Sequence, residues 1–352
     1  SLMVKKEYLD WVGGYDEQYN VAEGAEENLC RRMELADIHR LYYPEVLLQP
    51  GESRLSAAWK QSVPEDLLYD MLLPIKSKAD NRSKPGSGKL LYDWQEHPYA
   101  KEQCREYLSK LKQFDIPSDE VFEKSYPLIA LIPTYNESER ITDCLRSVEK
   151  YCDGIILLDD DSLDDTYEIA QSEKLLLKAK KVRTKFNDKQ NRNMLLDMVS
   201  FFKAKWFIFI DADERFDDRF VDLREVMKRD DVDTVGVWIA NLWNSMEAYR
   251  TDMEDTNLLS QNGLWFRWRM FRNKGRMQFI FVLKLHFMAV PYIKKNKAYN
   301  SKTLLLHLGY LNKDKRLNKY NLYQYEDELK LVNYDDILSL DISLRLVKDI
   351  SL

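Results

Sequence analysis

Short apolar runs that end on proline or aspartate recur along the chain from residue 126 onward. The clearest are residues 128–132, 154–158 and 206–210. Apolar runs of about four to eight residues that stop at such residues are typical of buried strands. Residues 182–186 are expected to form a further strand.

Segments with helical spacing separate these runs. They cover residues 139–151, 166–177 and 190–202. Strands that alternate with helices predict an α/β fold with a doubly wound, mostly parallel sheet flanked by helices. Ligands of such sheets bind at the carboxyl ends of the strands. The polar residues at those ends are Thr134, Asn136, Asp159, Asp160, Asp211 and Asp213.

The composition changes before residue 126. Residues 76–89 are polar and rich in Gly, Pro and Ser, which is typical of a linker. Residues 99–114 have the pattern of a charged amphipathic helix. The expected organisation is an N-terminal appendage (1–75), a linker and helix (76–125), the α/β domain (126–335) and a C-terminal helix (336–352).

The overall composition is that of a globular protein, with 352 residues, 45% of them hydrophobic and 32% charged. The sequence has no run of eighteen apolar residues, so no membrane span is predicted. Cysteine pairs with metal-site spacing are absent from the sequence, so a reducing cytoplasmic location is expected. A net charge of −6 argues against nucleic acid as a partner. Basic stretches such as residues 178–192 indicate a solvated surface or, alternatively, contact with phosphates or with lipids at the inner face of a membrane.

The strongest chemical feature is a pair of carboxylates, Asp211 and Asp213, directly after the apolar run 206–210. Hard oxygen ligands of this kind suit Mg²⁺ or Mn²⁺, which commonly also bind substrate phosphates. Such an ion would neutralise the diphosphate of a leaving nucleotide. The alternative is a solvated acidic turn that caps a helix beginning near Asp217.

Two further strand ends carry polar residues suited to a nucleotide. Thr134 and Asn136 have the groups to hydrogen-bond a base or ribose, although a turn and helix cap would use the same residues. Asp159 or Asp160 is expected to accept the imide N–H of uracil. Asp164 is expected to cap the next helix.

In order and spacing, these features resemble glycosyltransferase family 2, which has the GT-A fold. The resemblance covers about residues 126–325. It rests on Thr134-Tyr135-Asn136-Glu137, on the stretch 159–166 with aspartate in place of the family's two glycines, on Arg192-Asn193, and on Asp211-Ala212-Asp213. It implies a nucleotide-sugar site made of Pro133, Thr134, Asn136, Glu137, Asp159, Asp160, Arg192, Asn193 and Asp211.

Later motifs resemble a subgroup similar to lipopolysaccharide-core β-glucosyltransferases. They are residues 268–273, Leu285-His286, and His307-Leu308-Gly309-Tyr310 followed by a basic helix at 313–319. The resemblance implies a Mn²⁺ or Mg²⁺ ion held by Asp211, Asp213 and His307. A histidine bonded to the backbone at a strand end is the alternative for His307.

One residue departs from that subgroup, because Phe287 stands where its glutamate follows histidine. If that glutamate is the general base, the candidates to replace it are Glu214, Asp255 and His286. Residues 1–75 resemble the acceptor-side end of another family 2 domain. They are expected to be a remnant, a packing module or part of a tandem enzyme.

The resemblance implies a metal-dependent, inverting enzyme of cell-surface polysaccharide biosynthesis. It would move a sugar from a nucleotide-diphosphate donor, expected to be a UDP-sugar, to a hydroxyl of a glycan or glycolipid. One alternative is a homologue that binds such ligands without catalysis. Another is a nucleotidyltransferase, which residues 134–139 argue against because they form no Gly-rich basic loop.

Overall fold

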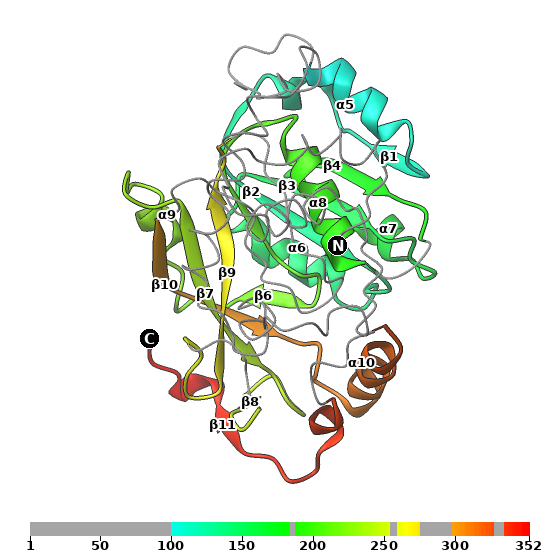
Figure 1. Cartoon of the computed structure of the whole chain (residues 1–352). Helices are drawn as coiled ribbons and strands as arrows, with labels where there is room; N and C mark the ends of the chain where they lie inside the picture. The colour runs from blue at the N-terminus through cyan, green and yellow to red at the C-terminus, as the bar shows by residue number, and fades with distance from the viewer. Residues whose placement is uncertain (1–99, 184–186, 254–258, 275–296, 327–333) are drawn as a thin grey trace, which may run out of the picture. The chain divides into compact units, whose positions relative to one another are not determined.

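The computed structural model describes residues 100–183, 187–253, 259–274, 297–326 and 334–352 (Figure 1). These residues all fall in one compact unit, which comprises Tyr92–Phe279 and Leu283–Leu352. The expectations for residues 1–75 and for residues 76–99 lie outside the described residues.

The unit is built on a nine-stranded sheet with the order β1-β4-β3-β2-β5-β9-β7-β10-β6. Its strands are β1 (Gln113–Asp115), β2 (Ser125–Thr134), β3 (Gly154–Asp159), β4 (Leu175–Lys180), β5 (Lys203–Phe209), β6 (Glu214–Phe216), β7 (Thr234–Asn241), β9 (Leu264–Arg272) and β10 (Ala298–His307). Strands β4, β3, β2 and β5 are parallel. The expected α/β class, with a parallel set of central strands, is therefore confirmed.

The other half of the sheet is mixed. Strand β9 lies antiparallel between β5 and β7, and β10 is parallel to β7 and antiparallel to β6. The carboxyl ends of β2, β3, β5, β7 and β10 therefore face the same way, which gathers their terminal residues along one side of the sheet.

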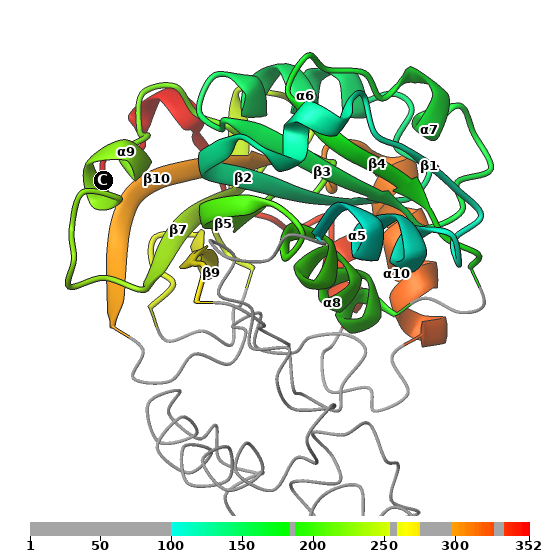
Figure 2. The same cartoon turned by 90° about the horizontal axis from the view of Figure 1, so that it is seen from above.

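Helices cover both faces of the parallel half (Figure 2). Figure 2 shows α6 (Ile141–Glu149) and α7 (Thr166–Ile169) on one face, with α5 (Ala100–Leu108) and α8 (Asp188–Val199) on the other. The predicted apolar stripe of α6 is confirmed, since Ile141, Leu145 and Val148 are buried in the core. Two further helices are α9 (Leu223–Val226) and α10 (Lys313–Glu326).

The strands of the parallel half are apolar because both faces are covered. All six residues of β3 are buried, and so are residues 128–132 of β2. Each such aliphatic side chain contributes about 1.5–3 kcal/mol by leaving water. Burial on both faces explains why these runs are continuous rather than alternating.

The structure corrects three expectations. The third strand in chain order was expected at residues 182–186, of which 184–186 lie outside the described residues. The strand that pairs with β3 is β4, Leu175–Lys180, which the sequence pattern assigns to the helix 166–177. A short leucine run has no period that separates a strand from a helix. The helix expected at 99–114 ends at Leu108, and β1 after it pairs with the edge of β4.

The third correction concerns the expected C-terminal helix at 336–352. The segment instead forms η3 (Asp335–Leu338), β11 (Leu344–Leu346) and η4 (Val347–Asp349). Strand β11 pairs with β8 (Ala248–Arg250). The buried guanidinium of Arg250 binds the Asp336 carboxylate, 2.6 Å from Nη2 to Oδ1. Backbone pairing and this ion pair outweigh the helical propensity of the segment.

Gly236 of β7 gives a test of this packing. A Cβ atom there would lie 1.8 Å from Cζ of Phe266, so any side chain must displace that ring. Gly236→Ala is expected to lower the free energy of unfolding by about 1–3 kcal/mol, as overpacked cores do. Denaturant unfolding measures it. The double variant with Phe266→Leu should lose less than the sum of the single losses, and additive losses would contradict the contact.

Candidate functional site

The ends of β2 and β3 bring the first group of predicted residues together. Thr134 lies opposite Asp159 in the parallel register. The backbone N–H of Asp160 donates to the carbonyl of Thr134 at 2.8 Å. Asn136, in the left-handed conformation with φ of 52°, donates its N–H to Oγ of Ser162 at 2.9 Å. The two loops after these strands are therefore fastened to each other.

Asp159 is committed to this loop. Both carboxylate oxygens of Asp159 accept hydrogen bonds from Ser162. Oδ1 accepts from its backbone N–H at 2.8 Å, and Oδ2 from its hydroxyl at 2.6 Å. Burial raises the pKa of Asp159, and the bonds from Ser162 oppose that effect. Asp159 therefore shapes the loop, and both of its oxygens already have protein donors.

Asp160 is enclosed by basic and amide groups. Its carboxylate pairs with Nζ of Lys181 at 2.6 Å and with Arg183, and it accepts from Nδ2 of Asn191 at 3.1 Å. The Arg183 guanidinium lies 3.8 Å from the centre of the Tyr135 ring. In contrast, Thr134 Oγ1 and Asn191 Oδ1 are buried without a hydrogen-bond partner. Thr134 Oγ1 and Asn191 Oδ1 therefore have unused hydrogen-bonding capacity.

Asp164 binds the start of α7, as expected of a capping residue. It lies one residue before the N-cap position. Its Oδ1 accepts from the N–H of Thr166 at 3.0 Å, and its Oδ2 from the N–H of Ser138 at 3.2 Å. The Thr166 hydroxyl accepts from the N–H of Glu137 at 2.7 Å. The loop after β2 is thus bound to the start of α7.

Asp211 follows β5 and lies between two guanidinium groups. Arg192 Nη2 is 2.8 Å from its Oδ1, and Arg269 Nη2 is 3.0 Å from its Oδ2. Burial alone would raise the pKa of Asp211, but the two arginines hold it below its usual value. The carboxylate is therefore ionised, and each oxygen has a charged partner.

Glu214 was a candidate for the general base, and its position argues against that role. Its side chain is 2% exposed, and Oε1 lies 2.7 Å from Nη2 of Arg269. Oε2 accepts from the backbone N–H of Asp211 at 2.9 Å. Burial raises the pKa of Glu214 to about 8. A carboxyl group enclosed in this way positions Asp211 and Arg269 and is not presented to an acceptor.

Asp213 and His307 meet at the start of β6 and the end of β10. His307 lies opposite Asn241 on one side and Glu214 on the other. The N–H of Leu308 donates to the carbonyl of Asp213 at 2.8 Å. His307 Nε2 then lies 3.2 Å from Asp213 Oδ2. The strand register therefore delivers the two side chains to one point.

Lys319 of α10 joins this pair. Its Nζ lies 3.1 Å from Asp213 Oδ2 and 2.9 Å from His307 Nε2. An ammonium group has no lone pair, so Nε2 must accept, and the imidazole proton is on Nδ1. Nδ1 lies 2.7 Å from Asn241 Oδ1, so its N–H donates a hydrogen bond to that oxygen. Burial and Lys319 lower the pKa of His307, so both contacts agree with a neutral ring.

Gly309 explains how the chain passes this group. A Cβ atom at Gly309 would lie 1.9 Å from Nζ of Lys319, 2.5 Å from Nε2 of His307 and 2.6 Å from Oδ2 of Asp213. Glycine at this position therefore lets the backbone approach all three of these side chains closely.

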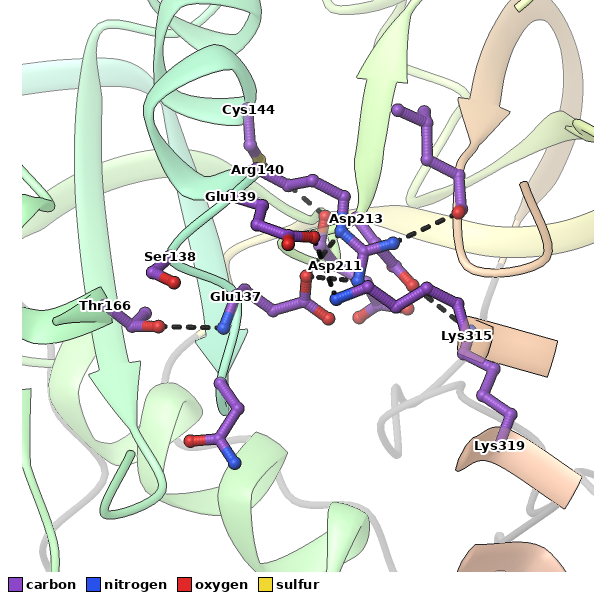
Figure 3. A network of polar contacts seen from close by, with 12 residues as sticks. Glu137, Ser138, Glu139, Arg140, Cys144, Thr166, Asp211, Asp213, Lys315 and Lys319 are labelled. Atoms are coloured by element: carbon purple, nitrogen blue, oxygen red, sulfur yellow. Dashed lines mark hydrogen bonds and ion pairs between the residues drawn. The ribbon is translucent and has the colours of Figure 1, made fainter. Parts of the chain in front are cut away.

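Arg140 and Glu137 complete the group in Figure 3, where Glu137, Asp213 and Lys319 point toward the same space. Arg140 pairs with Oε2 of Glu137 at 2.6 Å and donates to the carbonyl of Leu308 at 3.1 Å. Burial, followed by the charge of Asp213, raises the pKa of Glu137 to about 7. The loop after β2 is therefore linked to the loop after β10.

Two members of the expected metal set fit a divalent cation. Asp213 Oδ2 is a hard oxygen donor, and His307 Nε2 carries a lone pair while Nδ1 is held by an amide oxygen, as in many metal sites. Asp211 does not join them, because its oxygens face Arg192 and Arg269. Among the described residues, no three His, Cys, Asp or Glu side chains are grouped to hold a metal. An ion at Asp213 and His307 would need phosphate or water ligands as well.

The remaining predicted residues are placed as follows. Pro133 lies in β2 and Asn193 in α8. Asp255, His286 and Phe287 lie outside the described residues. Four further side chains of this site were not predicted from the sequence: Asn191, Asn241, Arg269 and Lys319. Arg269 and Lys319 lie within the motifs at residues 268–273 and 313–319. Their positive charge was the feature from which a role beside the carboxylates could have been predicted.

No helix in the described part of the chain is long and apolar enough to cross a membrane.

Known proteins resemble parts of this chain. Residues 129–302 match the family profile described as glycosyl transferase family 2. The SPbeta prophage-derived glycosyltransferase SunS of Bacillus subtilis (strain 168) is 35% identical over 85 residues, and the glycosyltransferase SunS of Bacillus phage SPbeta has the same values. The match covers 24% of this chain and only 19% of the length of each relative.

Solved structures with distant similarity include S. aureus TarS 1–349, with a TM-score of 0.34 and 16% identity over 60% of this chain and 69% of that one. The complex of TarS 1–349 with UDP-GlcNAc has a TM-score of 0.35 and 15% identity, over 60% and 70% of the two chains. Glucosyl-3-phosphoglycerate synthase from Mycobacterium tuberculosis, in complex with Mn²⁺, UDP and glucosyl-3-phosphoglycerate, has a TM-score of 0.25 and 15% identity, over 35% and 46%. The segment that matches the profile of glycosyl transferase family 2, residues 129–302, carries most of the site described above.

Proposed function

We propose that this chain is a glycosyltransferase that moves a sugar from a nucleotide-diphosphate donor, a UDP-sugar, to a hydroxyl group of a glycan or glycolipid. The observation that carries the proposal is the family match over residues 129–302, the residues that build the carboxyl side of the sheet. Polar groups with unused hydrogen-bonding capacity, and a carboxylate and an imidazole suited to a cation, lie on that same side.

The nucleotide end of the donor is assigned to the loops after β2 and β3. Thr134 Oγ1 can donate or accept, and Asn191 Oδ1 can accept an imide N–H. A buried polar atom without a partner costs about 1–3 kcal/mol, so a ligand that satisfies it gains affinity. Asp159 and Asp160 support this pocket through the loop and the basic side chains around them.

The diphosphate end is assigned to Asp213 and His307, which would hold a Mn²⁺ or Mg²⁺ ion. A bound ion would neutralise the charge that develops on the departing diphosphate. Arg140 and Lys319 lie beside this position and add positive charge without a metal. These residues orient the diphosphate so that its bond to the anomeric carbon can break.

Transfer would proceed with inversion in a single displacement. The acceptor oxygen attacks the anomeric carbon, the nucleoside diphosphate leaves with the bonding electron pair, and a base takes the hydroxyl proton. Asp255 and His286 remain the candidates for that base. The experiment that tests the function is transfer or hydrolysis of UDP-sugars with and without Mn²⁺. Donor binding without any turnover would favour the non-catalytic alternative.

Asp213 gives the first prediction. Asp213→Asn is expected to weaken Mn²⁺-dependent binding of a UDP-sugar by more than about 100-fold, since even residues behind metal ligands cost 10–100-fold. Titration calorimetry in the presence of Mn²⁺ measures it. Asp218→Asn, an exposed carboxylate that pairs with Lys150, is the matched control and should bind as the parent protein does. Unchanged donor affinity in Asp213→Asn would contradict the assignment.

Thr134 gives a prediction with two readouts of opposite sign. Thr134→Val keeps the shape but removes the unpartnered hydroxyl, so the free protein should be as stable as the parent or more stable. Affinity for UDP should fall by about 3- to 10-fold, the value of one hydrogen bond. Thermal unfolding and calorimetry measure the two effects. A loss of stability with unchanged UDP affinity would show that the hydroxyl serves the fold.

A further inference from the structure

Lys319 lies where a bound cation would lie. Its side chain extends from α10 and is 22% exposed, and its ammonium group contacts Asp213 Oδ2 and His307 Nε2 at 3.1 and 2.9 Å. Those two acceptor atoms are 3.2 Å apart. Two lone-pair atoms this close repel each other unless a cation or donor lies between them, so the ammonium group stabilises the pair.

A divalent ion cannot share this position with the ammonium group. An ion bound to both acceptors would lie about 2.0–2.2 Å from each of them, which places it within contact distance of Nζ. Two positive charges at that separation repel strongly at a buried site. The backbone at Gly309 closes one side, because it approaches Nζ, Nε2 and Oδ2 together.

We propose that Lys319 is a built-in cation that competes with the divalent ion for Asp213 and His307, and that the diphosphate of the donor draws it away. The inference rests on the proposed function, since the diphosphate is the donor's. The metal alone therefore binds weakly, whereas the metal and the nucleotide diphosphate bind together.

Movement of one side chain is sufficient for this exchange. The first turns of α10 are held by Lys315, whose Nζ lies 3.1 Å from Oε2 of Glu139, and by Arg316, which donates to the carbonyl of Tyr310 at 2.8 Å. Rotation about the bonds of the Lys319 side chain can then carry its charge from the carboxylate to phosphate oxygens. Lysine suits this role because its charge is compact and its stem is flexible.

The competition has a thermodynamic signature. If nucleotide removes the competitor, UDP must raise the affinity for Mn²⁺, and Mn²⁺ must raise the affinity for UDP by the same factor. Part of that coupling is expected from direct contact between metal and diphosphate. The part that depends on Lys319 is the difference in this coupling between the parent protein and a variant without the ammonium group.

The test is calorimetric titration of Mn²⁺ into the full chain, with and without saturating UDP. Lys319→Met keeps the length of the side chain without its charge. It is expected to bind Mn²⁺ about tenfold more tightly than the parent in the absence of UDP, equivalent to about 1.4 kcal/mol, and to gain less from UDP. Lys313→Met, at an exposed lysine at the start of the same helix, is the matched control and should behave as the parent.

Two outcomes would contradict the proposal, and they are distinguishable. If Lys319→Met binds Mn²⁺ no more tightly than the parent while the parent still shows UDP-dependent Mn²⁺ binding, the competition is disproved and the proposed function stands. If neither protein binds Mn²⁺ with or without UDP, both the competition and the metal dependence of the proposed function are disproved. Lys319→Gln, with its melting temperature measured, repeats the comparison should the methionine variant fold poorly.

Discussion

The site depends on one constraint, which is that carboxylates buried or half-buried at the end of a sheet must each have a cationic or N–H partner. A charge without a partner in the interior raises the free energy of the folded state by more than the rest of the fold can compensate. Asp211 meets the requirement with Arg192 and Arg269, Asp160 with Lys181 and Arg183, and Asp213 with Lys319. Much of the geometry of the site follows from these pairings.

The same constraint limits what substitutions can reveal. When one partner of a buried ion pair is removed, the other is left without compensation, and losses of about 3–5 kcal/mol are common. Arg269 illustrates the difficulty, because it serves both Asp211 and Glu214. Its replacement would disturb the fold and the site together. Substitution of a residue at the margin of the network, whose partners keep another contact, separates the effect on the fold from the effect on the site more cleanly.

The sequence predicted the parallel half of the sheet because its strands are buried on both faces and end on polar residues. The edge that carries Thr134, Asp159, Asp211 and Asp213 followed from that pattern. Strand β4 was missed because a leucine run has no diagnostic period. The cations of the site were missed for another reason. Arg269 and Lys319 lie 58 and 106 positions from the aspartates that they bind, and only the folded sheet defines those pairs.

Two neighbouring residues of α8 serve different strands, and this has a consequence for how the chain tolerates changes in length. Asn191 contacts Asp160 at the end of β3, while Arg192 contacts Asp211 after β5. One inserted or deleted residue in the first turn of α8 would rotate both side chains by about 100°, the angle per residue of a helix. Both contacts would be lost together. A change in chain length is therefore expected to be tolerated better at the ends of this connection than in the turn that contacts both strand ends.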